Sequence, residues 1–399
     1  MKKKVLFVNN TMGRAGAERT LLALLEMFDK EKYDVHFLAI IPRGEFFSLF
    51  PDGVKILNKK YSSKVIMDKK SLVWYILFVL RALFNKFNFI RFLPYMIKNL
   101  FGQIKQKNFS FDKLFWKVLA YNAPVLKDEY DLAIAYIEGA SLYYVTDRVK
   151  AKKKVSFVHI DYMRSGYVAK LDKPYFDKAD KIYGVSQSVV ESIMSTFPEC
   201  KYKTEMFQNT ISDRFVIESS NNGEGFKDDF DGIRLLTIGR LHYQKAYDIA
   251  IKAFASILEK TDIKIRWYII GEGIERGNLE KQIAKYQLKD KFILLGGKSN
   301  PYPYLKQCDI YVHATRYEGW CIATAEARIL CKPIIASDTA GIKEQLSNEN
   351  AVIINLNEQE IISSILKLAK NEKLRRDMSE KFKVKWERPN DIYKLEELI

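Results

Sequence analysis

Short apolar runs, each followed by a polar or glycine-bearing loop and then by a helical stretch, recur along this chain. Residues 5–8, 233–238 and 310–312 are examples. Strands that alternate with helices predict parallel sheets covered by helices. With 399 residues, 48% of them hydrophobic, the chain can bury two cores of ordinary domain size. We therefore expect an α/β protein of two Rossmann-like lobes, with ligands at the carboxyl ends of the strands.

A polar stretch divides the chain. Residues 218–225 read Glu-Ser-Ser-Asn-Asn-Gly-Glu-Gly and lack apolar periodicity. Such a composition is typical of a linker. We predict a first lobe over 1–217, a linker over 218–230 and a second lobe over 231–382.

Two glutamates follow the strand predicted at 310–312. Glu318 is expected in a loop and Glu326 early in the next helix, which begins near Ile322. The free N–H groups and positive dipole end of that helix suit an anion such as a diphosphate. A carboxylate would repel the anion, so both glutamates are expected to bind neutral hydroxyls of a ribose or a sugar. The expected ligand is a nucleotide sugar, although two glutamates at this spacing are also common on solvated surfaces.

A second group of polar residues follows the strand at 233–238. Gly239 ends that strand, and Arg240 and Lys245 come soon after it. Glycine lets backbone approach a phosphate closely, and the two cations supply positive charge.

These segments resemble one known family. The spacing of Glu318 and Glu326 is similar to the Glu-x7-Glu signature of the retaining glycosyltransferases of family 4, which have the two-lobed GT-B fold. The segment 239–248 resembles that family's Gly-Arg-Leu...Gln-Lys-Gly-x-Asp, with Ala246 in place of a glycine. Residues 13–19 are similar to its Gly-Gly-Ala-Glu-Arg loop, and the run 156–161 resembles a strand of its acceptor lobe that carries the active-site histidine.

The resemblance implies a role for each matching residue. Arg240 and Lys245 bind the donor diphosphate, Glu318 positions sugar hydroxyls, and Glu326 holds the ribose. From the first lobe, Gly16 closes over the donor, His159 lies near the donor sugar, and Asp161 faces the acceptor. Further donor-binding residues implied by the match are Gly239, Lys298, Gly319, Trp320, Cys321 and Ile322. The segment 383–399 is expected to cross back onto the first lobe.

The activity implied by the family is transfer of a sugar, with retained stereochemistry, from a nucleotide sugar, by preference a UDP-sugar. A lipid-linked saccharide of a bacterial surface polysaccharide is the expected acceptor. An epimerase or hydrolase of nucleotide sugars on the same fold is an alternative. Nucleic-acid binding is a weaker one, because no zinc spacing, helix-turn-helix signature or RNA-binding aromatic motif is present.

No metal or other cofactor is predicted. Asp229-Phe230-Asp231 spells the Asp-x-Asp of metal-dependent transferases of another fold, but it lies in the acidic region before residue 233, away from the other motifs. The leaving diphosphate is instead expected to be stabilised by Arg240, Lys245 and the helix start, which need no ion.

Half of the formal charge of +16 comes from one segment. No acidic residue occurs between Asp68 and Asp112, whereas eight lysines and arginines do, interleaved with aromatic residues. This pattern favours the headgroup layer of an anionic membrane as the partner of residues 69–107. Arg81 interrupts the apolar run too early for a spanning helix. Because Pro94 breaks the run, we expect two short helices joined by a bend; packing of the aromatics on the core is the alternative.

The cysteines and the first residues of the chain indicate where the protein is located. Four cysteines without paired spacing read as free thiols in a reducing environment. The first residues carry too short an apolar core for a signal peptide. We expect a cytoplasmic protein, peripheral on the inner membrane face.

Overall fold

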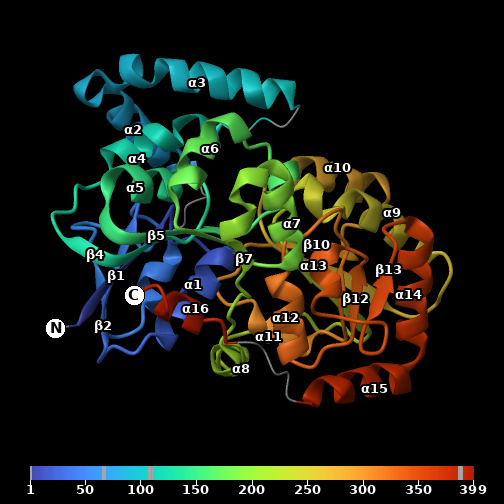
Figure 1. The fold of residues 1–399 in the computed structure, drawn as a ribbon. Coiled ribbons are helices and arrows are strands. Elements are labelled where there is room, and N and C mark those ends of the chain that lie inside the picture. The colour runs from blue at the N-terminus through green and yellow to red at the C-terminus, as the bar shows by residue number, and fades with distance from the viewer. Residues whose placement is uncertain (1, 65–68, 107–108, 110, 385–389) are drawn as a thin grey trace. The chain divides into compact units, whose positions relative to one another are not determined.

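The computed structural model describes residues 2–64, 69–106, 109, 111–384 and 390–399, and it divides into two compact units (Figure 1). Unit 1 comprises Met1–Ile211 with Pro389–Ile399, and unit 2 comprises Ser212–Arg388. These limits differ by several residues from the boundaries predicted at 217 and 383. The segment predicted as a linker belongs wholly to unit 2: Glu218 lies in a helix, and Asp228 forms ion pairs with Arg234 and Arg266.

A parallel sheet forms the centre of unit 1, with strand order β3-β2-β1-β4-β5-β6-β7 among the described residues. Its strands are β1 Lys3–Asn9, β2 Tyr33–Ala39, β3 Val54–Ile56, β4 Glu129–Ala135, β5 Lys150–Val158, β6 Lys181–Gly184 and β7 Thr204–Met206. Val5 pairs with Val35 on one side and Leu132 on the other, so β1 is central and its apolar side chains are fully buried. β5 ends at Val158, which leaves His159 in the following loop rather than in the expected strand.

Helices cover both faces of this sheet. They are α1 Gly16–Met27, α2 Lys69–Phe84, α3 Asn88–Lys105, α4 Trp116–Asn122, α5 Ala140–Arg148, α6 Ala169–Lys178, α7 Gln187–Thr196 and α16 Tyr393–Glu396. Short 3-10 turns are η1 Glu45–Leu49, η2 Asn85–Phe87, η3 Asp112–Phe115, η4 Tyr162–Arg164 and η5 Pro198–Lys203. The C-terminal segment is tied to the sheet of unit 1, because Tyr183 Oη donates to the Lys394 carbonyl and Lys394 Nζ donates to the Met206 carbonyl.

The predicted pair of helices at 69–107 is present, but Pro94 does not break it. Pro94 lies inside α3. The bend is η2, where Lys86 and Phe87 adopt left-handed conformations with φ of 49° and 55°. In the described residues no helix is long and apolar enough to cross a membrane.

Unit 2 contains a second parallel sheet, with strand order β10-β9-β8-β11-β12-β13. Its strands are β8 Ile233–Ile238, β9 Ile265–Ile270, β10 Phe292–Gly296, β11 Ile310–His313, β12 Ile334–Ser337 and β13 Val352–Ile354. Its helices are α8 Asp213–Asn221, η6 Tyr243–Lys245, α9 Tyr247–Leu258, α10 Arg276–Lys285, α11 Tyr302–Gln307, α12 Ile322–Ile329, α13 Ala340–Lys343, α14 Glu358–Lys370 and α15 Glu372–Lys383.

The order of these strands creates a switch point. From β8 the chain adds β9 and β10 on one side, and from β11 it adds β12 and β13 on the other. Leu235 pairs with Ile310 where the two halves meet. In open α/β sheets, ligands bind beyond the carboxyl ends of strands at such a point. The loops after β8 and β11 are therefore where a site is expected.

Candidate active site

Gly239 follows β8 and makes room for a lysine. Its N–H donates to the Ile270 carbonyl (3.0 Å), which fixes the start of the loop. A Cβ atom at this position would lie 3.3 Å from Lys245 Cε and 3.1 Å from Tyr247 Oη. Glycine therefore lets the stem of Lys245 run beside the end of the strand.

The turn that carries Lys245 keeps its shape without the glycine expected after it. Ala246 adopts a left-handed conformation (φ 47°, ψ 30°) and donates its N–H to the Tyr243 carbonyl (3.2 Å). This conformation costs a residue with a Cβ on the order of 1 kcal/mol. The hydrogen bonds of the turn therefore form with alanine at this position.

Hydrogen bonds join the loops after β8 and β11. Gln244 accepts from the backbone N–H of Arg316 (2.8 Å) and donates through its side chain to the Tyr317 carbonyl (2.7 Å). The Arg316 guanidinium donates to both carboxylate oxygens of Asp248, at 3.0 and 2.7 Å. Bidentate pairs of this kind fix orientation. The two loops therefore hold Lys245 and Glu318 at one place.

Four side chains meet there: Lys245, His313, Glu318 and Cys321. The Lys245 ammonium forms an ion pair with Glu318 Oε1, and its Nζ lies 3.2 Å from His313 Nε2. His313 Nε2 is 3.0 Å from Glu318 Oε1 and 3.2 Å from Cys321 Sγ. The side chains of Lys245 and Glu318 are only 11% and 9% exposed, so water screens their interaction weakly.

The cluster fixes the charge of Glu318. Burial by itself raises the pKa of this carboxyl, but the Lys245 ammonium and the His313 ring outweigh burial and lower the pKa to about 2. Burial likewise opposes charge on His313 and Cys321, yet their mutual attraction raises the pKa of the imidazole and lowers that of the thiol. Glu318 is therefore an ionised acceptor of hydrogen bonds and not a proton donor.

Glu326 lies in the middle of α12 and is fully buried. Tyr302 Oη donates to its Oε1 (2.9 Å), which orients the carboxylate. The helix begins at Ile322 immediately after Cys321, and the loop before it contains the buried Trp320. A Cβ on Gly341 would lie 2.2 Å from the Gly319 carbonyl, so α13 packs closely against this loop.

Two predicted donor-binding cations lie outside the cluster. Arg240 is exposed on the loop that follows β8. Lys298 follows β10, and its Nζ lies 5.7 Å from the centre of the Tyr304 ring. The structure does not bring either side chain into contact with Lys245 or Glu318.

Three predicted residues belong to unit 1. Gly16 is the first residue of α1. His159 donates its backbone N–H to Glu138 (3.0 Å), and its buried Nε2 has no hydrogen-bond partner among the described residues. Asp161 caps η4 and accepts from Ser192 Oγ (2.8 Å), so its carboxylate stabilises the local turn.

Sequence reasoning missed His313 and Gln244. His313 is the last residue of β11 and contacts three predicted site residues. A search for polar residues at the carboxyl ends of all strands would have found it. Gln244 acts through its backbone carbonyl and its amide, and no sequence pattern indicates that.

One group of residues has the chemistry of a metal site. The ligand atoms of His313, Glu318 and Cys321 lie within 4.8 Å of one another in the described residues. Imidazole, thiolate and carboxylate suit a metal such as zinc. In this structure, however, the Lys245 ammonium is already paired with Glu318, so an ion would compete with it. The arrangement is compatible with a lysine that binds an anion at least as well as with a site for a metal cation.

Each of the two units is a parallel sheet covered by helices, and unit 2 has a charged site at its switch point. This architecture is that of the GT-B class of proteins. The crystal structure of HepE from Anabaena in complex with UDP-glucose has the same fold: the TM-score is 0.62 at 15% identity, over 94% of this chain and 92% of that one. Residues 212–385, almost the whole of unit 2, match the family of group 1 glycosyl transferases. This match confirms the resemblance for unit 2, and the fold is the one expected from the sequence.

Curated relatives include enzymes of bacterial glycan synthesis. A Campylobacter jejuni protein named N-acetylgalactosamine-N,N'-diacetylbacillosaminyl-diphospho-undecaprenol 4-alpha-N-acetylgalactosaminyltransferase is 26% identical over 53% of this chain. The amylovoran biosynthesis glycosyltransferase AmsD of Erwinia amylovora is 23% identical over 50% of it. The chain spans only 56% and 57% of the length of these two relatives. It is homologous to bacterial polysaccharide glycosyltransferases.

Proposed function

We propose that this protein transfers a sugar, with retained stereochemistry, from a UDP-sugar to a lipid-linked saccharide in the synthesis of a bacterial surface polysaccharide. The observation that carries the proposal is the buried pair of Lys245 and Glu318 at the switch point of the matched unit. The names of the two bacterial relatives support a glycan acceptor, and one of them names a diphospho-undecaprenol.

The chemistry follows from the charges of the site. The donor diphosphate leaves the anomeric carbon while the acceptor hydroxyl approaches on the same face, and the departing phosphate oxygen takes the hydroxyl proton. Lys245 exchanges Glu318 for the diphosphate, and Arg240 and the start of α12 add further positive charge. Glu318, freed from the lysine but still ionised, accepts hydrogen bonds from sugar hydroxyls.

The remaining roles concern binding. Glu326, oriented by Tyr302, holds the ribose, and the loop that contains Lys298 lies by the base. Gly16 and His159 of unit 1 cover the donor and lie near its sugar, and Asp161 serves the acceptor. These three roles carry over from the family resemblance.

Metal independence is part of the proposal, because fixed cations already meet the leaving charge. Turnover is expected to be unchanged in EDTA. Loss of turnover that magnesium or manganese restores would contradict this, and the trio of His313, Glu318 and Cys321 would then be the first site to test.

The donor is tested by a thermal-shift screen of nucleotide sugars, followed by turnover of the best ligand with membrane extracts. A UDP-sugar is expected to raise the Tm of the wild-type protein and not that of Lys245→Ala. Lys252→Ala, an exposed lysine on α9, is the control and should behave as the wild type. Formation of product without any acceptor would favour the epimerase or hydrolase alternative.

We also propose that α2 and α3 place the enzyme on the inner face of an anionic membrane. The support is that α3 buries polar residues beside Phe92 and Tyr95 and exposes many apolar ones. α3 buries Asn88, Asn99 and Gln103, all of which make hydrogen bonds inside unit 1. Its outer face instead carries apolar residues that are 43% to 67% exposed, namely Ile90, Leu93, Ile97, Phe101 and Ile104.

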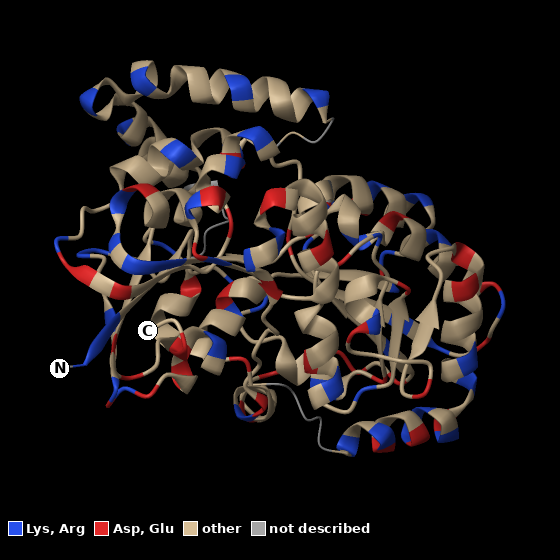
Figure 2. Ribbon diagram, in the orientation of Figure 1, with Lys and Arg blue, Asp and Glu red and all other residues tan. Residues whose placement is uncertain are grey.

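The charges of this face match an anionic surface. Figure 2 shows basic but no acidic residues along α3, consistent with a sequence that has no Asp or Glu from 69 to 111. α2 adds exposed Leu72, Leu77 and Phe84. An apolar face bordered by lysine and arginine suits the boundary of headgroups and acyl chains. Flotation with anionic liposomes tests this: a protein that stays at the bottom at physiological salt would contradict it.

A further inference from the structure

A cavity of about 730 Å³ lies in unit 1 beneath α3, where this helix meets α4 and α5. We call it the basic cavity and define it by Arg91, Lys98, Lys117, Tyr121, Tyr143 and Arg148. Its volume is in the range of small-ligand sites in proteins. None of these residues belongs to the proposed donor site, so the cavity has no role in the chemistry described above.

The charge of the cavity is strongly positive. Four of its lining side chains are cationic, and Asp147 is the one carboxylate in its described lining. That carboxylate already faces another cation, since Lys178 Nζ lies 3.7 Å from Asp147 Oδ1. Burial lowers the pKa of Lys117, and the nearby Lys178 and Arg91 add to this effect against Asp147. Cations crowded in this way are stabilised by an anion of more than one charge.

Two arginines are held in place by one aromatic ring. The guanidinium carbons of Arg91 and Arg148 lie 4.3 and 4.8 Å from the centre of the Tyr121 ring. Arg91 Nη1 also donates to Tyr121 Oη (2.5 Å). Arg148 Nε is a buried donor without an acceptor among the described residues. Guanidinium groups oriented in this way match the geometry of phosphate oxygens.

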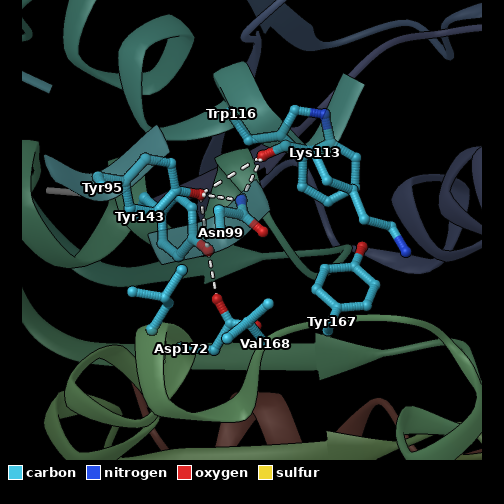
Figure 3. A pocket seen from close by; sticks show the side chains of 9 residues that line it. Tyr95, Asn99, Lys113, Trp116, Tyr143, Tyr167, Val168 and Asp172 are labelled. Atoms are coloured by element: carbon cyan, nitrogen blue, oxygen red, sulfur yellow. Dashed lines mark hydrogen bonds between the residues drawn. The ribbon is translucent and has the colours of Figure 1, made fainter. Parts of the chain in front are cut away.

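Hydrogen bonds hold Tyr95 and Tyr143, which line the inner side of the cavity. Figure 3 shows the smaller cavity next to it, with which it shares Tyr95, Tyr143 and Leu171. Asn99 Nδ2 donates to Tyr95 Oη (3.2 Å), and the hydroxyl of Tyr143 donates to the Asp172 carboxylate. Tyr162 donates to the same carboxylate, so its oxygens are occupied by hydroxyl donors.

The cavity adjoins the face proposed to meet the membrane. Arg91 and Lys98 line the cavity, and on the same helix Ile90, Leu93 and Ile97 are exposed. A phosphate group attached to a lipid chain would have its charge at the cavity and its chain at the apolar face. We infer that the basic cavity binds the phosphate or diphosphate group of a membrane lipid, which under the proposed function is the lipid-linked acceptor.

The first experiment uses inorganic pyrophosphate as the probe. Saturating UDP fills the donor site, and calorimetry then measures the binding of pyrophosphate to the full-length protein. One pyrophosphate per chain is expected. The double variant Lys117→Gln, Arg148→Gln should bind it at least ~10-fold more weakly, as expected when two oriented cations are removed. Lys86→Gln, Lys105→Gln removes the same charge from outside the cavity and should bind as the wild type.

The second experiment distinguishes the source of the phosphate. Vesicles of phosphatidylcholine are compared with vesicles that also contain a polyprenyl diphosphate. The wild type should prefer the latter, and the cavity double variant should not, while its affinity for UDP and its Tm stay unchanged. Equal binding to both vesicles would overturn the lipid assignment in favour of a free phosphate. Absence of a pyrophosphate site in the presence of UDP would overturn the inference itself, whereas loss of UDP binding by Lys245→Ala would still support the donor site.

Discussion

The two groups of cations in this chain are held in opposite ways. In unit 2, Lys245 is buried against the ionised Glu318, so one positive and one negative charge are matched. In unit 1, Arg91, Lys98, Lys117 and Arg148 line one cavity that has a single carboxylate in its described lining. A matched pair can release its lysine to a ligand and keep a useful carboxylate behind. The unmatched group is the one that we expect to bind an external anion.

The largest effect is expected from breaking the matched pair. Lys245→Ala should lower kcat by at least ~10²-fold, because it removes a stabiliser of the leaving diphosphate. It should also destabilise the protein by about 3 kcal/mol, since the buried Glu318 then lacks its partner. Steady-state kinetics and urea unfolding measure the two effects. A variant with normal stability would mean that the ion pair is not formed in solution.

His159 tests a buried imidazole that forms no ion pair in the described residues. Burial lowers its pKa from 6.5 to about 4. The folded state therefore binds fewer protons than the unfolded state between these pH values, so the stabilisation is complete above pH 6.5 and is lost as pH falls toward 4. The loss is at most roughly 3 kcal/mol. Urea unfolding as a function of pH should show a shallower slope for His159→Gln; an unchanged slope would contradict the assignment.

Arg240→Ala tests the effect of a cation on turnover without an effect on stability. It is exposed, so Arg240→Ala should lower kcat by ~10²-fold while leaving the free energy of unfolding within about 0.5 kcal/mol of the wild type. The contrast with Lys245→Ala, which is expected to lose stability as well, sharpens the comparison. Normal turnover of the Arg240 variant would remove this residue from the donor site.

The apolar face of α3 predicts an effect on membrane binding alone. Ile97→Asp should weaken binding to anionic liposomes at least ~10-fold, because an inserted isoleucine contributes about 1.5 to 3 kcal/mol. The control is Leu49→Asp, since Leu49 in η1 and Ile97 are both 43% exposed. Cosedimentation measures the binding. Equal losses in both variants would show that no defined face is involved.

The smallest effect concerns the turn beside Lys245. Ala246→Gly should stabilise the protein by about 1 kcal/mol, because glycine adopts the left-handed conformation without strain. A shift of Tm in a thermal melt measures it. A loss of stability would mean that packing of the Ala246 methyl group outweighs the strain.

Much of unit 2 could be predicted from the sequence because its signals are local. The strand predicted over 233–238 has those limits in the structure, and the one predicted over 310–312 extends by a single residue to His313. Gly239, Lys245 and Glu318 each follow such a strand, so their convergence at one edge follows from parallel pairing. The contact between His313 and Cys321 depends on a side-chain direction that the spacing does not give.

Unit 1 could be predicted less well because its signals depend on tertiary packing. The bend at Lys86 and Phe87 carries no glycine, and Pro94 is tolerated inside α3. The polar residues of α3 point inward only because Ala82, Tyr95 and Lys113 offer them partners. A composition rich in lysine and aromatic residues predicted a surface, but not the cavity behind it.

The central claim is that a nucleotide sugar binds at the switch point of unit 2 through its diphosphate. A crystal structure with the UDP-sugar found in the screen tests it most directly. We expect diphosphate oxygens within hydrogen-bond distance of Lys245 Nζ and Arg240, with the ribose on Glu326 and with Lys245 withdrawn from Glu318. A nucleotide bound far from Arg240 and Glu326, with Lys245 and Glu318 still paired, would contradict it.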